Sequence, residues 1–262
     1  MKTLQEILST TIIPDKGLIL KLISFIDLTT LDNCDTQETV LALVSKANEG
    51  FEGVHPAALC TFANYGDLVR DNLIPKIKCA VVGGCFPTGQ TLSAVKIEET
   101  RLISATSIDE IDIVLNRGDF FSQNYTRIKN EISVIKSTIG DKCLKVILET
   151  GDLETVENIK HASELAIQSG ADFIKTSTGK TNIGATHEAV YTMCKVIKTH
   201  YANTGIAIGI KPSGGIRTLN DAIYLYKIVH YILGKKWLQK DLFRIGASSL
   251  YNNLITAFND QK

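Results

Sequence analysis

The chain has 262 residues, of which 44% are hydrophobic and 21% are charged, a composition typical of a globular protein with a large core. Its 28 basic and 28 acidic residues give no net charge, and the sequence has no basic run of the kind that binds nucleic acid or a membrane surface. We therefore expect no nucleic-acid or membrane partner, and any anionic ligand must be held by a local site.

The six cysteines do not have the spacing of a metal site. None forms a Cys-x-x-Cys pair, and no pair of histidines lies near them at zinc-binding spacing, which favours free thiols in a reducing compartment. Pro14, Asp15 and Lys16 break the apolar runs near the N-terminus, unlike a signal peptide. The longest uncharged stretch, 79–95, contains glycines and Pro87 and does not resemble a membrane span. We expect a cytoplasmic protein.

Segments typical of strands and helices alternate along the chain. An apolar run over 22–26 predicts the first strand, and a helix follows to about residue 49, opened by Asp35 and Glu38 in the pattern of a capping box. Residues 1–20 are expected to form a helical extension before this strand. The other expected strands span 54–60, 78–82, 111–115, 145–148, 173–175, 206–210 and 243–245. The other expected helices span 64–72, 88–104, 122–139, 153–166, 187–201, 219–233 and 249–258.

Eight alternating strand–helix units predict a parallel sheet with helices outside it. Eight units in about 250 residues match the count and length of a closed (β/α)8 barrel, or TIM barrel. No break in composition divides the chain, so we expect a single α/β domain over residues 1–262. The competing doubly wound sheet would carry a Gly-x-Gly-x-x-Gly after an early strand, and the sequence has none.

Two lysines end apolar strands, where a charged residue is costly. Lys175 follows the run 171–174, and Lys211 follows the run 205–210. Burial lowers the pKa of a lysine, and two lysines on neighbouring strands would each disfavour the other's charge. A neutral amine can attack an aldehyde to form a Schiff base, which then accepts electrons during carbon–carbon bond cleavage. A buried structural ion pair is the alternative interpretation of either lysine.

Other polar residues lie at strand ends, which meet at one mouth of a barrel. They are Asp27 after the first strand, Cys60 after the second, Asp112 within the fourth and Glu149 at the fifth. Asp112 alternates with Ile111 and Ile113, so it is expected on the opposite face of the strand from them. With a lysine and a bridging water nearby, its carboxylate would shuttle protons. Packing is the favoured role for Cys60, and Glu149 is left open as a partner for a lysine. Four of the five histidines fall on predicted helices, which argues against a metal-dependent aldolase.

Loops rich in glycine and hydroxyl groups follow the last three strands. Phosphate sites in barrels are commonly built from the loops after strands seven and eight, where backbone N–H groups and a helix start face the anion. We therefore expect a phosphorylated substrate of modest size. The loop residues are Gly179 and Lys180 after the sixth strand, Gly214 and Gly215 after the seventh, and Gly246, Ser248 and Ser249 after the eighth.

At these residues the sequence resembles the deoxyribose-phosphate aldolases, a family of class I aldolases, over nearly its whole length. The motifs that carry the resemblance are IDLTTL (26–31), DFIKTSTGK (172–180), KPSGGIR (211–217) and GASSL (246–250). The resemblance implies a (β/α)8 barrel that reversibly splits 2-deoxy-D-ribose 5-phosphate into acetaldehyde and D-glyceraldehyde 3-phosphate. It implies no metal and no other cofactor.

The resemblance also implies roles for single residues. Lys175 would form the Schiff base, Lys211 would lower its pKa and move protons, and Asp112 would be the acid/base that works with a water. Ser213 stands where many relatives have alanine, and the chain lacks the C-terminal tyrosine that reaches the active site in some relatives. The implied substrate-binding positions are Asp27, Cys60, Thr176, Gly179, Lys180, Gly214, Gly215, Gly246, Ser248 and Ser249.

Other functions fit part of the pattern. Another Schiff-base aldolase, of the transaldolase or keto-acid type, would share the paired lysines. A non-catalytic sugar-phosphate binding barrel would keep the glycine loops without a buried Lys175. A sugar-phosphate isomerase would depend on Glu149 or Asp112 and not on Lys175. The sequence leaves the oligomeric state open, with a homodimer as one outcome.

Overall fold

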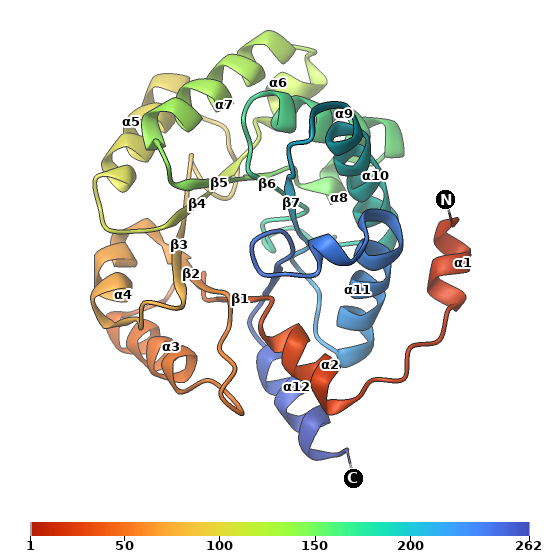
Figure 1. Ribbon diagram of the computed structural model, residues 1–262. Helices are drawn as coiled ribbons and strands as arrows, with labels where there is room; N and C mark the ends of the chain where they lie inside the picture. Colours follow the sequence, from red (N-terminus) through yellow and green to blue (C-terminus); the bar gives the residue numbers. More distant parts are fainter. Residues whose placement is uncertain (1, 262) are drawn as a thin grey trace.

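The computed structural model describes residues 2–261, which form a ring of parallel strands surrounded by helices (Figure 1). The strand order is β7-β6-β5-β4-β3-β2-β1-β8, and parallel bridges from Ile210 to Phe243 and from Ser213 to Gly246 join its two ends. The ring is closed, which confirms the predicted (β/α)8 barrel. The strands are β1 (Ile26–Thr29), β2 (Ala58–Phe62), β3 (Lys78–Gly83), β4 (Glu110–Val114), β5 (Cys143–Ile147), β6 (Phe173–Lys175), β7 (Gly209–Lys211) and β8 (Ile245–Ala247).

Helices follow the strands and bury their apolar faces against the outside of the barrel, where most of the hydrophobic core lies (Figure 1). They are α1 (Leu4–Ser9), α2 (Lys16–Ile23), α3 (Gln37–Glu49), α4 (Gly66–Asn72), α5 (Ser93–Ser104), α6 (Arg117–Phe121), α7 (Tyr125–Ile139), α8 (Thr150–Leu153), α9 (Val156–Gln168), α10 (His187–Thr204), α11 (Leu219–Leu233) and α12 (Leu250–Asn259), with 3₁₀ turns η1 (Ala63–Tyr65) and η2 (Lys235–Trp237).

The prediction of a first strand over 22–26 is wrong, because helix α2 runs through Ile23. The Asp15 side chain accepts a hydrogen bond from a backbone N–H of the first turn, so the helix begins with a strong N-cap. Its buried face includes Ile23, and apolar residues on that face produce the run that predicted a strand. Strand β1 begins at Ile26, so Asp27 lies within the strand and not after it.

The helix expected after the first strand also begins differently from the prediction. Thr36 is its N-cap and forms a capping box with Thr39, whereas the predicted box used Asp35 and Glu38. The Asp35 carboxylate instead accepts a hydrogen bond from the Thr30 hydroxyl at 2.7 Å. The loop between β1 and α3 is therefore fixed by its own side chains.

The two helices before β1 pack against the last helices of the chain (Figure 1). Helix α1 contacts α10 and α11, and Lys227 Nζ donates to the carbonyl of Leu8 at 2.8 Å. Helix α2 lies beside α12. No helix within residues 2–261 is both long enough and apolar enough to cross a membrane.

The strand register brings charged residues together inside the barrel. Asp112 on β4 is paired with Lys145 on β5, and Lys175 on β6 is paired with Lys211 on β7. Side chains alternate between the two faces of a strand, so residues in register on neighbouring strands share a face. All four are at most 3% exposed. Register therefore positions the candidate site.

Candidate active site

A network of charged side chains fills the barrel beneath its mouth, and we call it the interior ion network. Every member is almost completely buried, which requires each charge to have a partner. Contacts run from strand to strand across the barrel interior. The members are the carboxylates Asp27, Glu110 and Asp112 and the cations Lys145, Lys175, Lys211 and Arg244.

Asp112 is the carboxylate shared by the two predicted catalytic lysines. Its Oδ2 lies 2.8 Å from Lys175 Nζ and 2.7 Å from Lys211 Nζ, and its Oδ1 lies 3.0 Å from Lys145 Nζ. Burial alone would raise the pKa of Asp112, but the three ammonium groups outweigh burial and hold the pKa well below its usual range. Asp112 is thus a charged acceptor that faces both lysines.

Lys175 and Lys211 differ in their carboxylate contacts. Lys211 Nζ also lies 2.5 Å from Asp27 Oδ2, whereas within residues 2–261 Lys175 has an ion pair with Asp112 alone. Burial lowers the pKa of Lys175, and the charge of Lys211 lowers it further. Burial acts on Lys211 too, but Asp112 and Asp27 outweigh it and raise its pKa. Lys175 is therefore the lysine whose amine is more readily neutral.

Charge balance in the network leads to the same assignment. The three carboxylates are matched by Lys145, Lys211 and Arg244, so the network is neutral before Lys175 is counted. An additional positive charge in a buried site is unfavourable. Lys175 shares its one carboxylate, Asp112, with Lys211. Of the four cations in the network, Lys175 therefore loses its proton with the smallest loss of electrostatic energy.

Three members of the network were not predicted from the sequence: Glu110, Lys145 and Arg244. The Arg244 guanidinium donates to Asp27 Oδ1 at 2.7 Å and to Glu110 Oε1 at 2.8 Å, and Lys145 forms a close ion pair with Glu110. A signal for Glu110 was present, because it lies two residues before Asp112 and so faces the same side of β4. Polar residues at strand ends pointed to the site, whereas these charges lie within or beside the strands.

Above this network the barrel opens into a cleft of about 430 Å³ that Lys175 helps to line. Thr29, Thr30, Asp32 and Arg217 also line it and were not predicted. The lining includes all the loop residues predicted for a phosphate site, namely Gly179, Lys180, Gly214, Gly215, Gly246, Ser248 and Ser249. The loops after β6, β7 and β8 thus line the same hollow as the lysine amine, and Lys180 and Arg217 bring cations to it.

Three residues predicted to bind substrate do not line this cleft. Asp27 is buried in the ion network, beneath Lys211. Cys60 is buried in a small apolar cluster, and burial raises the pKa of its thiol. The Thr176 hydroxyl donates to the carbonyl of Ser213 at 3.1 Å and accepts from its N–H at 2.9 Å. Direct contact with a ligand in this cleft is therefore not expected of these three side chains.

Glu149 has partners other than the lysines. Its buried carboxylate accepts hydrogen bonds from the Thr178 and Thr181 side chains, and its nearest cation is Arg117, at 3.7 Å. Within the described part of the chain no lysine forms an ion pair with it. Glu149 therefore acts on the loop after β6 and not on the amine of Lys175.

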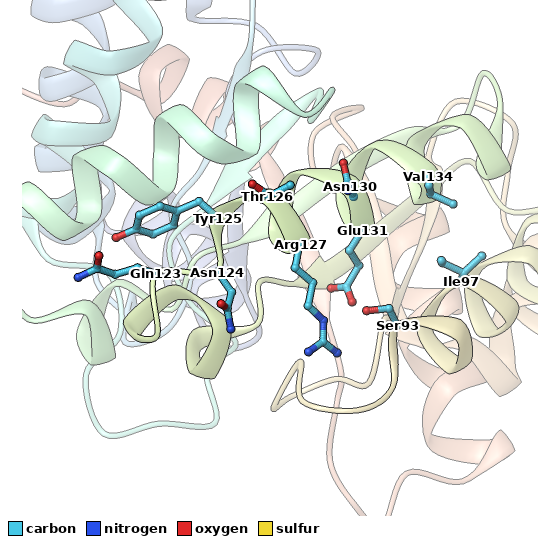
Figure 2. A pocket seen from close by; sticks show the side chains of 10 residues that line it. All are labelled: Ser93, Ile97, Gln123, Asn124, Tyr125, Thr126, Arg127, Asn130, Glu131 and Val134. Atoms are coloured by element: carbon cyan, nitrogen blue, oxygen red, sulfur yellow. The ribbon is translucent and has the colours of Figure 1, made fainter.

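A second hollow, of about 670 Å³, lies on the outside of the barrel between α5 and α7 (Figure 2). Beneath it a buried ion pair joins Lys96 Nζ to Glu131 at 2.5 Å, and Lys96 also donates to the carbonyl of Val114 at 3.1 Å. These contacts fasten the two helices to the end of β4. Among residues 2–261, no group of three or more His, Cys, Asp or Glu side chains is placed to hold a metal ion.

Comparison with known proteins agrees with this arrangement. A family model described as DeoC/LacD family aldolase matches residues 21–253. The human deoxyribose-phosphate aldolase is 37% identical over 251 residues, which cover 90% of this chain and 79% of the human protein, and the mouse enzyme has the same identity and coverage. A structure of the deoxyribose phosphate aldolase from Aeropyrum pernix, described as a unique tetrameric structure, superposes with a TM-score of 0.71 at 26% identity, covering 99% of this chain and 97% of the other.

A closed barrel with a buried lysine pair beneath a cleft lined by glycine loops and cations fits the class of sugar-phosphate aldolases that work through a lysine amine. The chain belongs to the DeoC/LacD family of aldolases.

Proposed function

We propose that this protein reversibly cleaves 2-deoxy-D-ribose 5-phosphate to D-glyceraldehyde 3-phosphate and acetaldehyde, with Lys175 as the Schiff-base residue. The observation that carries the proposal is the position of Lys175, which lines the cleft, has a lowered pKa and lies 2.8 Å from Asp112. The relatives named above and the three glycine loops support the choice of substrate. The activity serves the breakdown of deoxyribose phosphate.

Schiff-base formation uses the neutral amine of Lys175. The amine attacks C1 of the open-chain sugar, and loss of water from the carbinolamine gives an iminium. Asp112 lies within hydrogen-bond reach of the Lys175 and Lys211 ammonium groups, so it can accept and return the protons of this step. Lys211 keeps its own proton and helps to hold the pKa of Lys175 down.

Cleavage then breaks the bond between C2 and C3. Asp112, acting through a water, removes the proton of the C3 hydroxyl, and the electron pair of the C2–C3 bond moves into the iminium. D-Glyceraldehyde 3-phosphate leaves as the new aldehyde, and an enamine remains on Lys175. Protonation at C2 and hydrolysis of the iminium release acetaldehyde and restore the amine.

The phosphate end of the sugar lies among the loops after β6, β7 and β8 in this proposal. Glycines there let backbone N–H groups approach the anion closely. Lys180 and Arg217 supply positive charge at the same cleft. This end of the site provides binding energy, while Lys175 and Asp112 carry the chemistry.

Reductive trapping tests the proposal directly. Borohydride added in the presence of acetaldehyde should leave an ethyl group on Lys175, identified by peptide mass mapping. A folded protein that binds sugar phosphate without forming this adduct would instead favour an isomerase or a binding protein.

The variant Lys175→Ala separates chemistry from binding. It should abolish turnover, because the amine that forms the Schiff base is gone, while affinity for inorganic phosphate stays nearly unchanged. Both are measured on the same preparation, by coupled assay and by calorimetry. Retained turnover in the variant would exclude Lys175 as the Schiff-base residue.

The proposal includes a cytoplasmic protein that assembles with copies of itself. The structure of the Aeropyrum pernix relative is described as tetrameric, which supports assembly, with a homodimer as the smallest form. Sedimentation equilibrium distinguishes the monomer from a dimer or tetramer.

A further inference from the structure

Glu149 is a fully buried carboxylate that the proposed mechanism does not use. It lies just after strand β5 and adopts a left-handed backbone conformation, with φ 57° and ψ 63°. A residue with a side chain is disfavoured there and persists only where its surroundings hold it. We therefore ask which contacts hold Glu149 in this conformation.

The carboxylate of Glu149 binds the turn that follows strand β6. It accepts a hydrogen bond of 2.5 Å from Thr178 Oγ1, bonds of 3.3 Å from the Thr178 N–H, and one of 3.2 Å from Thr181 Oγ1. Between these two threonines lie Gly179 and Lys180, which line the cleft. The carboxylate thus holds both ends of the segment that lines the cleft.

A chain of hydrogen bonds connects the carboxylate to the backbone of the cleft. The N–H of Lys180 donates to Thr178 Oγ1 at 3.0 Å, and that hydroxyl donates to Glu149. The hydrogen of the Thr178 hydroxyl is therefore used in the bond to Glu149, and the hydroxyl oxygen can accept the bond from Lys180. Loss of the carboxylate would release the hydroxyl and with it the orientation of the Lys180 backbone.

Arg117 offsets the negative charge of Glu149. Its Nη1 lies 3.7 Å from Glu149 Oε2, and its Nε lies 3.1 Å from Asp152. Arg117 begins α6, so segments after β4, β5 and β6 meet at this carboxylate. The partner cation limits the repulsion that a buried carboxylate would exert on a phosphate group.

We infer that Glu149 is a positioning residue that presents the turn from Thr178 to Thr181 to the substrate's phosphate group. It acts through the turn and touches neither the substrate nor Lys175. The inference rests on the proposed function, because it assigns the phosphate end of that site. It predicts that substitution of Glu149 weakens the binding of phosphorylated sugars and leaves the rate of the chemistry at C1 nearly unchanged.

The experiment compares Glu149→Ala and Glu149→Gln on two sugars, 2-deoxyribose 5-phosphate and unphosphorylated 2-deoxyribose. Glu149→Ala should raise KM for the phosphorylated sugar about tenfold or more, with kcat changed less than KM, because the turn loses charged hydrogen bonds. The kcat/KM for 2-deoxyribose should stay within about twofold, because that sugar has no phosphate for the turn to bind. Glu149→Gln keeps one acceptor oxygen and should restore most of the affinity.

A milder pair of variants covers the case in which Glu149→Ala does not fold. Thr181→Val removes one hydrogen bond to the carboxylate and should raise KM for the phosphorylated sugar about threefold. Thr100→Val is its control, since the Thr100 hydroxyl bonds only within helix α5 in the described structure and its loss should leave KM unchanged.

Two results would overturn the inference: an equal loss for both sugars in Glu149→Ala, or an unchanged KM for the phosphorylated sugar in both Glu149→Ala and Thr181→Val. Failure of the proposed function has a different signature, because the unaltered protein itself would then cleave neither sugar. In that case calorimetry with inorganic phosphate still decides, since weaker binding in Glu149→Ala supports the role and unchanged binding contradicts it.

Discussion

Lys175 and Lys211 occupy paired positions on neighbouring strands, yet their surroundings give them opposite pKa shifts. Lys211 is held between Asp27 and Asp112, and Lys175 has a share of Asp112 only. The identity of the two residues could be predicted from the sequence, because both end apolar strands. The division of roles was implied by the family resemblance and not by the apolar runs, because its physical cause is Asp27, which comes from a strand far away in the chain.

Removal of Lys211 should shift the pH dependence of Schiff-base formation upward. In Lys211→Met the positive charge that lowers the pKa of Lys175 is gone, and Asp112 is left to stabilise the ammonium of Lys175. The neutral amine then appears only at higher pH. The rate of borohydride trapping with acetaldehyde, measured from about pH 5 to 10, should rise at a higher pH in this variant than in the unaltered protein.

Asp112→Asn is a control for this prediction, because it should shift the pKa of Lys175 in the opposite direction. It removes the carboxylate that stabilises the Lys175 ammonium, so the pKa of Lys175 should fall and trapping should begin at lower pH. Turnover should be lost all the same, because the proton acceptor is gone. Shifts in the same direction for Asp112→Asn and Lys211→Met would contradict the charge-balance account of the network.

At the scale of elements, the number and order of strand–helix units could be predicted from the sequence, while the bounds of short apolar runs could not. The apolar run 22–26 is compatible with either a strand or a helix. The N-cap at Asp15 starts a helix that continues as far as Ile23. Two charged residues within strands, Glu110 and Lys145, were missed for a related reason: Lys145 is favourable in a strand only because Glu110 and Asp112 face it from β4.

The loops after β6 and β7 pack backbone against backbone, and this contact can be tested at Gly184. A Cβ there would overlap the carbonyl of Gly214, and the N–H of Ala185 donates to the carbonyls of Ser213 and Gly214 at 3.1 and 3.0 Å. Gly184→Ala should therefore push the two loops apart and raise KM for 2-deoxyribose 5-phosphate about tenfold, by misplacing phosphate contacts. Steady-state kinetics measure the change.

Gly140→Ala is the matched control for Gly184→Ala. Gly140 follows helix α7 with φ 61°, and a Cβ added there would meet no atom within 4 Å. With ψ −126° it lies outside the left-handed helical region, so its substitution brings backbone strain of about 1–3 kcal/mol and no collision. The free energy of unfolding of this variant should fall by that amount, and its KM should stay the same. Equal kinetic effects at the two glycines would show that KM responds to stability and not to loop placement.

At the scale of the whole molecule, the interior ion network links strands that lie far apart in the chain. Arg244, next to β8, reaches Asp27 on β1 and Glu110 on β4. The barrel as a class could be predicted from eight repeating units. The partners across its interior could not, because strand spacing in the sequence does not determine which side chains meet after closure.

The network should make stability fall at acid pH. The pKa values of Asp27 and Asp112 are lowered in the folded protein, because surrounding cations outweigh burial. Their contribution is therefore complete above the unfolded carboxyl pKa of about 4 and is lost as the pH falls through the lower folded values. Urea denaturation at about pH 3, 4, 5 and 7 should give a free energy of unfolding that is level from about 5 to 7 and drops below about 4. If the free energy of unfolding stayed the same down to the lowest pH, these carboxylates would contribute little to the stability of the folded protein.

Arg244→Met should lower the free energy of unfolding by about 3–5 kcal/mol, because it leaves Asp27 and Glu110 buried with one cation fewer. The matched control is Arg101→Met, which removes an exposed ion pair with Glu98 on helix α5 and should cost at most about 0.5 kcal/mol. Urea denaturation at neutral pH measures both. Near pH 3 the difference between Arg244→Met and the unaltered protein should shrink, because Arg244 helps to hold the pKa of Asp27 down, and in the variant Asp27 can take up a proton and cease to be an unbalanced charge. A difference that stays constant with pH would mean that Arg244 acts by packing alone, and the barrel would then owe its closure to apolar contacts and not to the charges at its centre.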